Sequence, residues 1–334
     1  MKRIYQASNA TLKQNAVAEA ADAAKLRIAI NLDIDQMASF INKLAFLFIV
    51  EMVEMVPVTN RKDTKASMKC ISIDLDGTLL NSESEITIES VKVLNELQAR
   101  GHCLILNTGR AYADVIKLEA VQKIKMPIFC INGSVLYSAD QELLFEATLP
   151  LDVYKNVFSV LKGMDVGILV YTNYGGLPST LPPLREKSRQ ELDKIFHEFN
   201  YDQILDKEDL KIYKLIALVH PDQLEKIEEV KNALTGKFPI SMASSHPNNV
   251  EITSNEAHKG KALLRYQDMM NLTFDEIFAF GDGGNDIAQF EVATTAVAME
   301  NAPMQVQQAA DVITKSNDED GFAYAVRHLL GLLD

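Results

Sequence analysis

Four short polar motifs constrain the fold of this chain, because three of them follow or end an apolar run rich in β-forming residues. They lie far apart along 334 residues and read Asp74-Leu75-Asp76-Gly77-Thr78, Leu106-Asn107-Thr108-Gly109-Arg110, His258-Lys259-Gly260-Lys261 and Gly281-Asp282-Gly283-Gly284-Asn285-Asp286. In a parallel α/β sheet, ligands gather at the carboxyl ends of the strands. The motifs therefore predict a parallel sheet whose strand ends bring these side chains together.

Two patterns of predicted elements divide the chain. In residues 68–150 and 251–334, strand-like and helix-like segments alternate, which predicts a Rossmann-like, doubly wound parallel sheet core with helices on both faces. In residues 151–250, paired strands with short turns predict an inserted α+β domain. Among the single elements, we expect helices over residues 88–99 and 111–121 and strands over 240–243 and 312–313. The expected fold class is therefore α/β. Residues 1–67 are expected to form an N-terminal extension, helical or disordered, that carries no chemistry.

The composition argues against several classes of partner. A net charge of −13 does not suit a nucleic acid or an anionic membrane, because both attract basic proteins. The apolar run from Leu44 to Val50 is too short to span a bilayer, which takes about 20 apolar residues. Three cysteines without a CxxC pair, Cys70, Cys103 and Cys130, favour small buried side chains in a reducing compartment. We expect a cytoplasmic monomer or homodimer with no nucleic-acid or membrane partner.

The first motif offers two carboxylates, Asp74 and Asp76, and Gly77 allows the chain to bend beside them. A carboxylate can attack phosphorus and form an acyl phosphate. A second carboxylate can protonate the leaving oxygen and then activate the water that cleaves the intermediate. We expect Asp74 to be the nucleophile and Asp76 the acid and base. Taken alone, the motif also fits an Asp-Gly turn, so this interpretation depends on the other three motifs.

The second and third motifs supply partners for a phosphate group. Thr108 can donate a hydroxyl hydrogen bond, and the backbone N–H groups of Gly109 and Arg110 would lie at a helix start, which attracts anions. Lys259 can stabilise the negative charge of Asp74 and of the transferring phosphoryl group. In isolation, Thr108 fits a helix cap and Lys259 a surface lysine. We expect Thr108 and Lys259 to be catalytic, and Gly109 and Arg110 to bind phosphate.

The fourth motif completes an acidic cluster that calls for a divalent cation. One lysine cannot offset four aspartates and a phosphate dianion, and Mg²⁺ prefers oxygen ligands. We expect Mg²⁺ to be held by a side-chain oxygen of Asp74, the backbone carbonyl of Asp76 and a side-chain oxygen of Asp282. Asp286 would lie behind these ligands and hold a water or orient the lysine. Asn285 is expected to hydrogen-bond the phosphate.

Together the four motifs, in this order and spacing, resemble those of the haloacid dehalogenase-like hydrolase superfamily. The resemblance runs from about Met68 to the end of the chain. The insertion between the second and third motifs resembles the α/β cap of the Cof-type subgroup. Asn132-Gly133 after the third predicted strand and the tail Ala298-Met299-Glu300-Asn301-Ala302 also fit that subgroup, and Asn132 is expected at the substrate site.

The resemblance implies an activity as well as a fold. In the family pattern, Asp74 is the nucleophile, Asp76 the acid and base, and Asp282 the third metal ligand, while Thr108 and Lys259 contact phosphate. It implies a Mg²⁺-dependent phosphatase of small phosphorylated metabolites, sugar phosphates foremost, that acts through an aspartyl-phosphate intermediate. A phosphomutase with the same four motifs is the alternative, and a non-enzymatic phosphometabolite-binding protein is the less favoured one.

Overall fold

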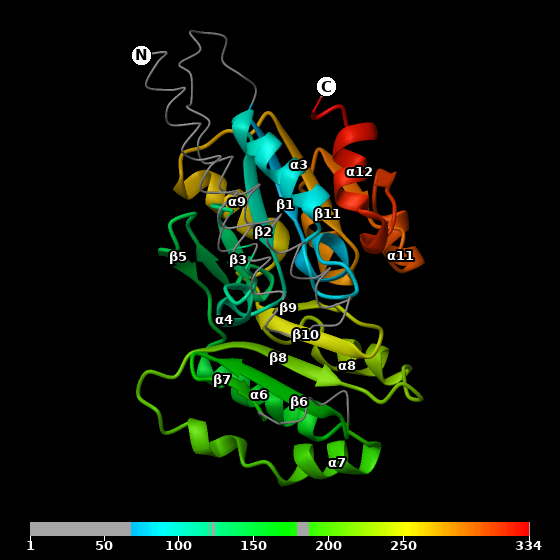
Figure 1. Ribbon diagram of the computed structural model, residues 1–334. Coiled ribbons are helices and arrows are strands. Elements are labelled where there is room, and N and C mark those ends of the chain that lie inside the picture. The colour runs from blue at the N-terminus through cyan, green and yellow to red at the C-terminus, as the bar shows by residue number, and fades with distance from the viewer. Residues whose placement is uncertain (1–67, 120, 122–123, 179–186, 334) are drawn as a thin grey trace, which may run out of the picture. The chain divides into compact units, whose positions relative to one another are not determined.

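A computed structural model describes residues 68–119, 121, 124–178 and 187–333 of the chain. The N-terminal extension predicted for residues 1–67 lies outside the described residues. Two sheets organise the rest. We call the part built on the eight-stranded sheet the core and the part built on the five-stranded sheet the cap (Figure 1).

The core sheet has the strand order β13-β12-β11-β1-β2-β3-β4-β5. Its strands are β1 (Lys69–Ile73), β2 (Cys103–Asn107), β3 (Ile128–Cys130), β4 (Val135–Tyr137), β5 (Leu143–Glu146), β11 (Glu276–Gly281), β12 (Thr295–Ala298) and β13 (Val312–Ile313). All neighbours from β13 to β3 pair in parallel. β1 is central between β11 and β2, so the carboxyl ends of these three strands meet at one edge.

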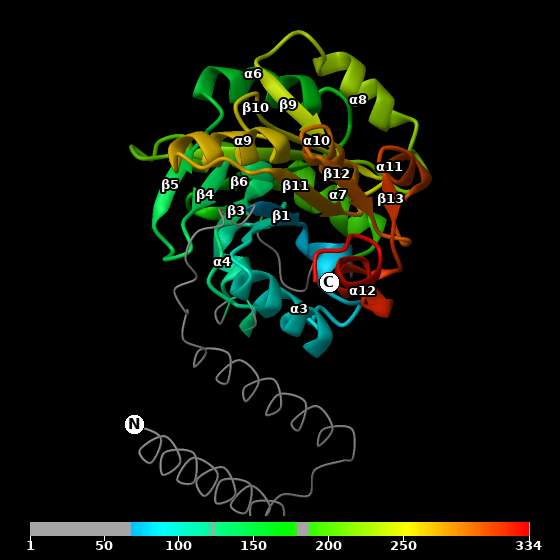
Figure 2. The same cartoon turned by 90° about the horizontal axis from the view of Figure 1, so that it is seen from above.

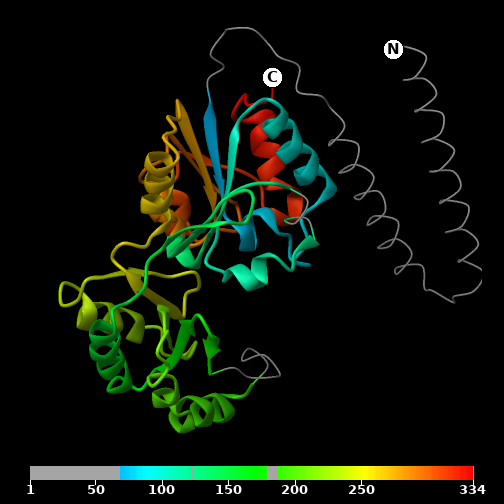
Figure 3. The same ribbon diagram turned by 90° about the vertical axis from the view of Figure 1, so that its left-hand side faces the viewer.

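Helices cover both faces of the core sheet, which agrees with the predicted doubly wound α/β class. The core helices are α3 (Ile88–Ala99), α4 (Tyr112–Val115), α9 (Lys259–Met269), α10 (Ile287–Phe290), α11 (Met304–Gln308) and α12 (Gly321–His328). Figures 2 and 3 show α9 and α10 on one face and α3 and α12 on the other. The helix predicted for residues 111–121 is shorter than expected, since α4 ends at Val115.

An antiparallel hairpin at one edge of the core sheet departs from the predicted all-parallel order. β4 pairs antiparallel with β3, and β5 pairs antiparallel with β4. A parallel crossover takes a dozen or more residues, whereas only residues 131–134 separate β3 from β4. The short connection therefore forces the chain to reverse, and the sequence pattern of this region did not reveal it.

The cap sheet is antiparallel throughout, with the order β7-β6-β8-β10-β9. Its elements are β6 (Gly167–Thr172), β7 (Gly175–Leu177), β8 (Ile212–Leu218), β9 (Ile240–Ala243) and β10 (Asn249–Ser254), with α6 (Leu151–Lys162), α7 (Arg189–Glu198) and α8 (Lys226–Leu234). β10 runs to Ser254, so the predicted end of the insertion at 250 divides a strand and lies too early. Strand pairing with β8 and β9, rather than composition, sets that limit.

The two faces of the cap sheet differ in polarity because side chains alternate along a strand. In β10, Val250 and Ile252 point into the cap's hydrophobic core, together with residues of α6 and α8. Glu251 and Thr253 therefore point to the opposite face, and the side chain of Glu251 reaches Asn132 of the core. The polar face of the cap sheet thus lies against the core. None of the described helices is long and apolar enough to cross a membrane.

Candidate active site

Asp74 directly follows β1, the central strand of the core sheet. Its backbone N–H donates to the carbonyl of Phe280 at 3.0 Å, which extends the pairing of β1 with β11 by one residue. The chain then turns in the segment η1 (Leu75–Leu79). Asp76 and Gly77 have non-helical backbone angles there, and Gly77 has φ +72°. The strand end and the turn hold the Asp74 carboxyl in a buried position, with 5% of the residue exposed.

Lys259 is the first residue of α9, and the ring of His258 caps this helix by accepting a hydrogen bond from the backbone of Lys261 at 3.2 Å. The ammonium group of Lys259 lies 2.5 Å from Oδ1 of Asp74 and 2.7 Å from Oδ1 of Asp286. Burial alone would lower the pKa of Lys259, but the carboxylates of Asp286 and Asp74 raise it above its ordinary value. Lys259 is therefore a charged ammonium that bridges two carboxylates.

Asp74, Asp282 and Asp286 form one acidic cluster, in which one oxygen of each lies within 4.8 Å of the others. The first and second of these residues are separated by more than two hundred positions, and the pairing of β1 with β11 brings them together. Burial raises the pKa of Asp282 to about 7. The negative charge of Asp286 adds to this shift, and the positive charge of Lys259 opposes it. Burial likewise raises the pKa of Asp74, with Lys259 opposing the shift.

This donor set fits a hard divalent cation. The cluster offers carboxylate oxygens only, which are the ligands that Mg²⁺ prefers. Three carboxylates and one lysine leave net negative charge at a buried position, and a bound cation would relieve that charge. The residues present therefore fit a divalent cation, with Asp74 and Asp282 as the side chains that would hold it.

Asp286 is already committed to organising its neighbours. Its Oδ2 accepts hydrogen bonds from the backbone of Asp282 at 3.0 Å and of Gly283 at 2.9 Å. Its Oδ1 accepts from Lys259 and from the side chain of Gln289, both at 2.7 Å. Through these four contacts, Asp286 fixes the fourth motif and the lysine.

Gly77 brings the first and fourth motifs into contact. A Cβ atom at this position would lie 2.3 Å from Oδ2 of Asp282, in addition to the strain of its positive φ. The side chain of Asn301 also contacts this turn and donates a hydrogen bond to the backbone carbonyl of Gly77 at 2.9 Å. Thr78 donates to Oδ1 of Asp282 at 3.2 Å. The turn after β1 is therefore packed directly on the acidic cluster.

The last three residues of the second motif, 108–110, form a loop after the end of β2. We call this segment the phosphate loop. Thr108 is buried, and its hydroxyl oxygen accepts a hydrogen bond from the backbone of Arg110 at 3.1 Å. The side chain of Arg110 pairs with the carboxylate of Asp76, whose Oδ2 lies 2.7 Å from Nε. The Asp76 side chain is 55% exposed and takes no part in the acidic cluster.

This arrangement differs from the expectation that Arg110 contacts phosphate and Asp76 a leaving group. Both side chains are engaged with each other in a bidentate ion pair, which is the strongest geometry open to an arginine and a carboxylate. Substrate would have to displace this pair before the Asp76 carboxylate could reach a leaving oxygen.

Asn132 and Asn285 also meet, although they come from different motifs. Nδ2 of Asn285 donates to Oδ1 of Asn132 at 3.0 Å, and Nδ2 of Asn132 donates to Glu251 of the cap. Asn132 has φ +56°, a left-handed conformation that asparagine tolerates better than most residues. The two amides thus join the loop after β3, the fourth motif and the cap.

Several polar residues that sequence reasoning missed support the site from within the core. Ser72 donates to Oε1 of Gln289 at 2.7 Å, and Nδ2 of Asn107 donates to Oε1 of Gln289 at 3.1 Å and to the carbonyl of Lys259 at 3.2 Å. All three side chains are buried. Polar residues inside otherwise apolar strands and helices were the available signal, because a buried polar group needs a partner.

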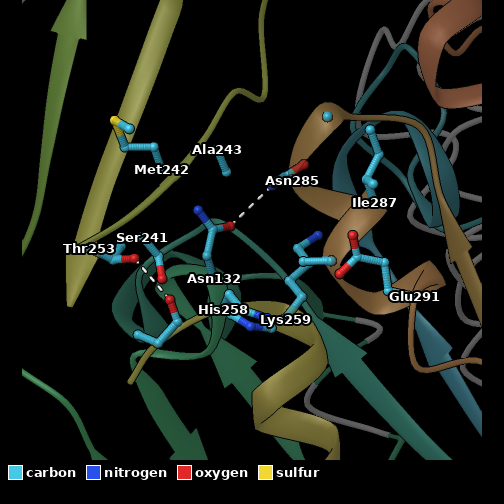
Figure 4. Close-up of a pocket in the computed structure, with 13 residues that line it drawn as sticks. Asn132, Ser241, Met242, Ala243, Thr253, His258, Lys259, Asn285, Ile287 and Glu291 are labelled. Atoms are coloured by element: carbon cyan, nitrogen blue, oxygen red, sulfur yellow. Dashed lines mark hydrogen bonds between the residues drawn. The ribbon is translucent and has the colours of Figure 1, made fainter. Parts of the chain in front are cut away.

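A cavity of about 320 Å³ lies between core and cap, where α9 and α10 of the core face β9 of the cap (Figure 4). Asn132, Asn285 and Lys259 line it on the core side, and Met242 and Ala243 line it on the cap side. Its size falls at the lower end of the range for small-molecule pockets. The cavity therefore has room for a small ligand between core and cap. Lys259 is the residue that it shares with the acidic site, and Asp74, Asp282 and Asp286 do not line it.

The family model for haloacid dehalogenase-like hydrolases matches residues 71–326. The chain belongs to the haloacid dehalogenase-like hydrolase family. The predicted family, its Cof-type subgroup and the Rossmann-like core with a cap are therefore confirmed, as is the enzyme class, a phosphoric monoester hydrolase.

Individual members of the family match nearly over their whole length. The 5-amino-6-(5-phospho-D-ribitylamino)uracil phosphatase YwtE of Bacillus subtilis (strain 168) is 30% identical over 79% of this chain and 98% of that protein. The pyridoxal phosphate phosphatase YbhA of Escherichia coli (strain K12) is 25% identical over 78% of this chain and 99% of that protein. A solved haloacid dehalogenase-like hydrolase from B. subtilis aligns with a TM-score of 0.69 and 27% identity, over 79% of this chain and 100% of that one.

Proposed function

We propose that this hydrolase cleaves small phosphorylated metabolites with the help of Mg²⁺, through a phosphoryl group carried on Asp74. The observation that supports the proposal best is the contact of a buried lysine with Asp74 inside a cluster of three carboxylates. A structural aspartate would be satisfied by the lysine alone, whereas this cluster holds more negative charge than one lysine offsets. The excess charge suits a site that binds a cation and a phosphate together.

The chain's own residues would divide the work as follows. Asp74 attacks phosphorus, and Lys259 stabilises the negative charge on both reacting groups. The Thr108 hydroxyl and the N–H of Gly109 would hold phosphate oxygens. Asp74 and Asp282, with the backbone of Asp76, would hold Mg²⁺, which neutralises charge on the phosphoryl oxygens when bound.

Asp76 would protonate the leaving oxygen and then take a proton from the attacking water. Its ion pair with Arg110 therefore describes a resting arrangement that substrate has to open. Asn132 and Asn285 line the cavity beside the cluster, so the leaving group has amide partners there. We propose that the cap closes this cavity and excludes bulk water during the reaction.

Sugar phosphates and phosphorylated cofactors are the substrate classes that we propose. The B. subtilis relative is named for a phosphate ester on a ribityl chain and the E. coli relative for pyridoxal phosphate. Both are small compounds, which the cavity of about 320 Å³ suits. A screen of phosphorylated metabolites that includes these two compounds would rank the classes by kcat/KM.

The first test of the function is the Asp74→Asn variant, assayed with p-nitrophenyl phosphate and Mg²⁺. We expect turnover to fall at least 1,000-fold, since removal of a nucleophile that acts as part of a unit costs orders of magnitude. Asp140→Asn is the matched control, because Asp140 is exposed and its nearest lysine, Lys125, is 4.0 Å away, which makes a loose ion pair. Turnover by D74N within tenfold of the wild type would end the proposal.

A phosphomutase is the second candidate, because the same residues could return the phosphoryl group to an isomer of the substrate. Product analysis separates the two functions, since a phosphatase releases one inorganic phosphate per substrate consumed. A mutase would instead yield an isomeric phosphate ester with little free phosphate.

We also propose the domain limits and the setting of the enzyme. Residues 68–150 and 255–334 would form the core and residues 151–254, which reach the end of β10, the cap, with residues 1–67 as an extension. The free cysteines Cys70, Cys103 and Cys130 suit the reducing cytoplasm. A variant that lacks residues 1–67 should keep its kcat, and gel filtration would decide between monomer and homodimer.

A further inference from the structure

A buried ion pair of the cap lies directly on the phosphate loop. Lys214 of β8 and Glu251 of β10 have residue exposures of 2% and 4%, and the lysine Nζ lies 3.4 Å from Oε1 of Glu251. Both point to the polar face of the cap sheet. A buried pair of this kind costs desolvation energy and is a weak source of stability, so its position calls for another explanation.

Lys214 contacts the core through the backbone of the phosphate loop. Its ammonium donates a hydrogen bond to the carbonyl of Gly109 at 3.1 Å, across 105 positions of the sequence. The Gly109 carbonyl belongs to the same peptide plane as the N–H of Arg110, which donates to the hydroxyl oxygen of Thr108 at 3.1 Å. Lys214 therefore fixes a peptide plane that in turn fixes the hydroxyl proposed to bind phosphate.

The other carbonyls of the loop are fixed by the core itself. The backbone of Asn132 donates to the carbonyl of Thr108 at 3.0 Å, and that of Ile131 donates to the carbonyl of Arg110 at 2.9 Å. Of the three carbonyls of the phosphate loop, that of Gly109 is thus the one that accepts a hydrogen bond from the cap. Among the described residues, no group accepts a hydrogen bond from the N–H of Gly109, so this donor is available to a phosphate oxygen.

Glu251 ties the lysine to the amides of the site. It accepts hydrogen bonds from Asn132 and, at 2.9 Å, from the hydroxyl of Ser245. Burial opposes its ionisation, but the charge of Lys214 and the hydrogen bonds from Asn132 and Ser245 lower the pKa of Glu251. The Glu251 carboxylate therefore holds the lysine where it meets Gly109.

Close packing confines the cap at this place. A Cβ atom on Gly109 would lie 3.2 Å from Oδ1 of Asn132, and one on Gly284 would lie 2.8 Å from the carbonyl of Ser244 in the cap. The absence of a side chain at Gly284 thus lets the cap approach the fourth motif, while Gly109 gives room to Asn132 of the core. The contact of Lys214 with Gly109 forms only when the cap is seated on the core.

We propose that Lys214 is a positioning residue for the hydrolysis, which orders the Thr108–Arg110 peptide planes for phosphate when the cap is seated, and that Glu251 holds Lys214 for this task. The proposal rests on the function proposed above. It links closure of the cap to the readiness of the phosphate loop through one hydrogen bond.

The test uses the full chain with Mg²⁺ and p-nitrophenyl phosphate, and inorganic phosphate as the competitive inhibitor. The main variant is K214M/E251Q, which removes both charges and so leaves neither one buried without a partner. We expect its kcat to fall at least tenfold and its inhibition constant for inorganic phosphate to rise at least fivefold. K214R keeps a charged donor and should stay within threefold of the wild type in both constants.

K231M is the matched control, because Lys231 lies on α8 of the cap and pairs only at the surface with Glu228. Circular dichroism would report folding, since a purely structural role would lower the melting temperature and leave the kcat of the folded protein unchanged. If K214M/E251Q does not fold, K214Q replaces it with the same thresholds, because its shorter amide cannot reach Gly109.

The outcomes separate this inference from the function itself. A folded K214M/E251Q whose kcat and phosphate inhibition stay within threefold of the wild type would overturn the role of Lys214 and leave the phosphatase intact. A loss in K214R as large as that in the double variant would also overturn it, because a charged donor would then not suffice. A wild-type chain without phosphatase activity would instead defeat the proposed function.

Discussion

The pH dependence of Mg²⁺ binding tests the acidic cluster most directly. Without metal, burial and the charge of Asp286 raise the pKa of Asp282 from 3.8 to about 7, against the opposing charge of Lys259. A proton and a cation then compete for the same carboxylate. With a pKa near 7, about one carboxyl in ten is ionised at pH 6 and about nine in ten at pH 8, so the apparent affinity for Mg²⁺ should fall about tenfold from pH 8 to pH 6.

This change in affinity translates into stability. A Mg²⁺ concentration about ten times the dissociation constant at pH 8 stabilises the folded state by about 1.4 kcal/mol, and the same concentration at pH 6 by about 0.4 kcal/mol. With an unfolding entropy of about 2.1 cal/mol/K per residue, 1 kcal/mol shifts the melting temperature of a 334-residue chain by about 1.4 °C. The increase in melting temperature on adding Mg²⁺ should therefore drop from about 2 °C at pH 8 to about 0.6 °C at pH 6.

The sign of the effect without metal follows from linkage. A carboxyl whose folded pKa is raised contributes stability that is present below its unfolded pKa, near 3.8, and is lost as the pH rises through about 7. The protein in EDTA should therefore lose stability as the pH rises towards 7, and Mg²⁺ should restore what is lost. Above about pH 8, where this carboxyl is almost fully ionised, it adds little further change.

Thermal unfolding by circular dichroism, with EDTA or MgCl₂ at pH 6, 7 and 8, would measure these shifts. Asp282→Asn should bind Mg²⁺ weakly at every pH and flatten the profile, whereas Asp140→Asn, an exposed site, should behave like the wild type. Equal Mg²⁺ increments at pH 6 and pH 8 in the wild type would refute the reasoning, and so would a D282N variant that keeps the wild-type pH dependence.

Two further predictions follow from contacts at the cluster. Lys259→Met leaves two buried carboxylates without their cation and should cost about 3–5 kcal/mol in urea unfolding with EDTA. Lys261→Met, on a half-buried side chain whose ammonium donates to the carbonyl of Asn255, should cost about 1 kcal/mol or less, and similar costs for both would contradict the prediction. Gly77→Ala should lower kcat at least tenfold, because its Cβ would lie 2.3 Å from Asp282, whereas Gly101→Ala, at φ +85° with nothing within 4 Å, should destabilise by about 1 kcal/mol and keep kcat. Equal kcat values for the two glycine variants would show that the contact with Asp282 is unimportant.

Local features of the fold could be predicted well because they depend on neighbouring residues. The helix predicted over residues 88–99 has the same limits as α3, since Thr87 caps its start and Gly101 follows its end. β9 and β13 also begin and end where predicted. The β4–β5 hairpin was missed, because its strands are short and direction depends on the length of a connection rather than on side-chain pattern.

The candidate site shows the same division. The sequence predicted that Asp74, Lys259 and Asp282 would meet, because the carboxyl ends of neighbouring parallel strands share an edge, and the structure brings them together. It did not predict that Asp76 would pair with Arg110 or that Gln289 would support the cluster. Those contacts depend on rotamers and on loop geometry that only the packed protein selects.

The sequence by itself therefore determined the family, the two kinds of sheet and the acidic residues at the strand ends, because motif, spacing and alternation are local properties. Only the tertiary structure decided which face of the cap sheet meets the core, and it placed Lys214 and Glu251 on the phosphate loop. The physical reason is that a contact across 105 positions depends on how two separate sheets pack, and residues distant in sequence carry no local pattern that records it.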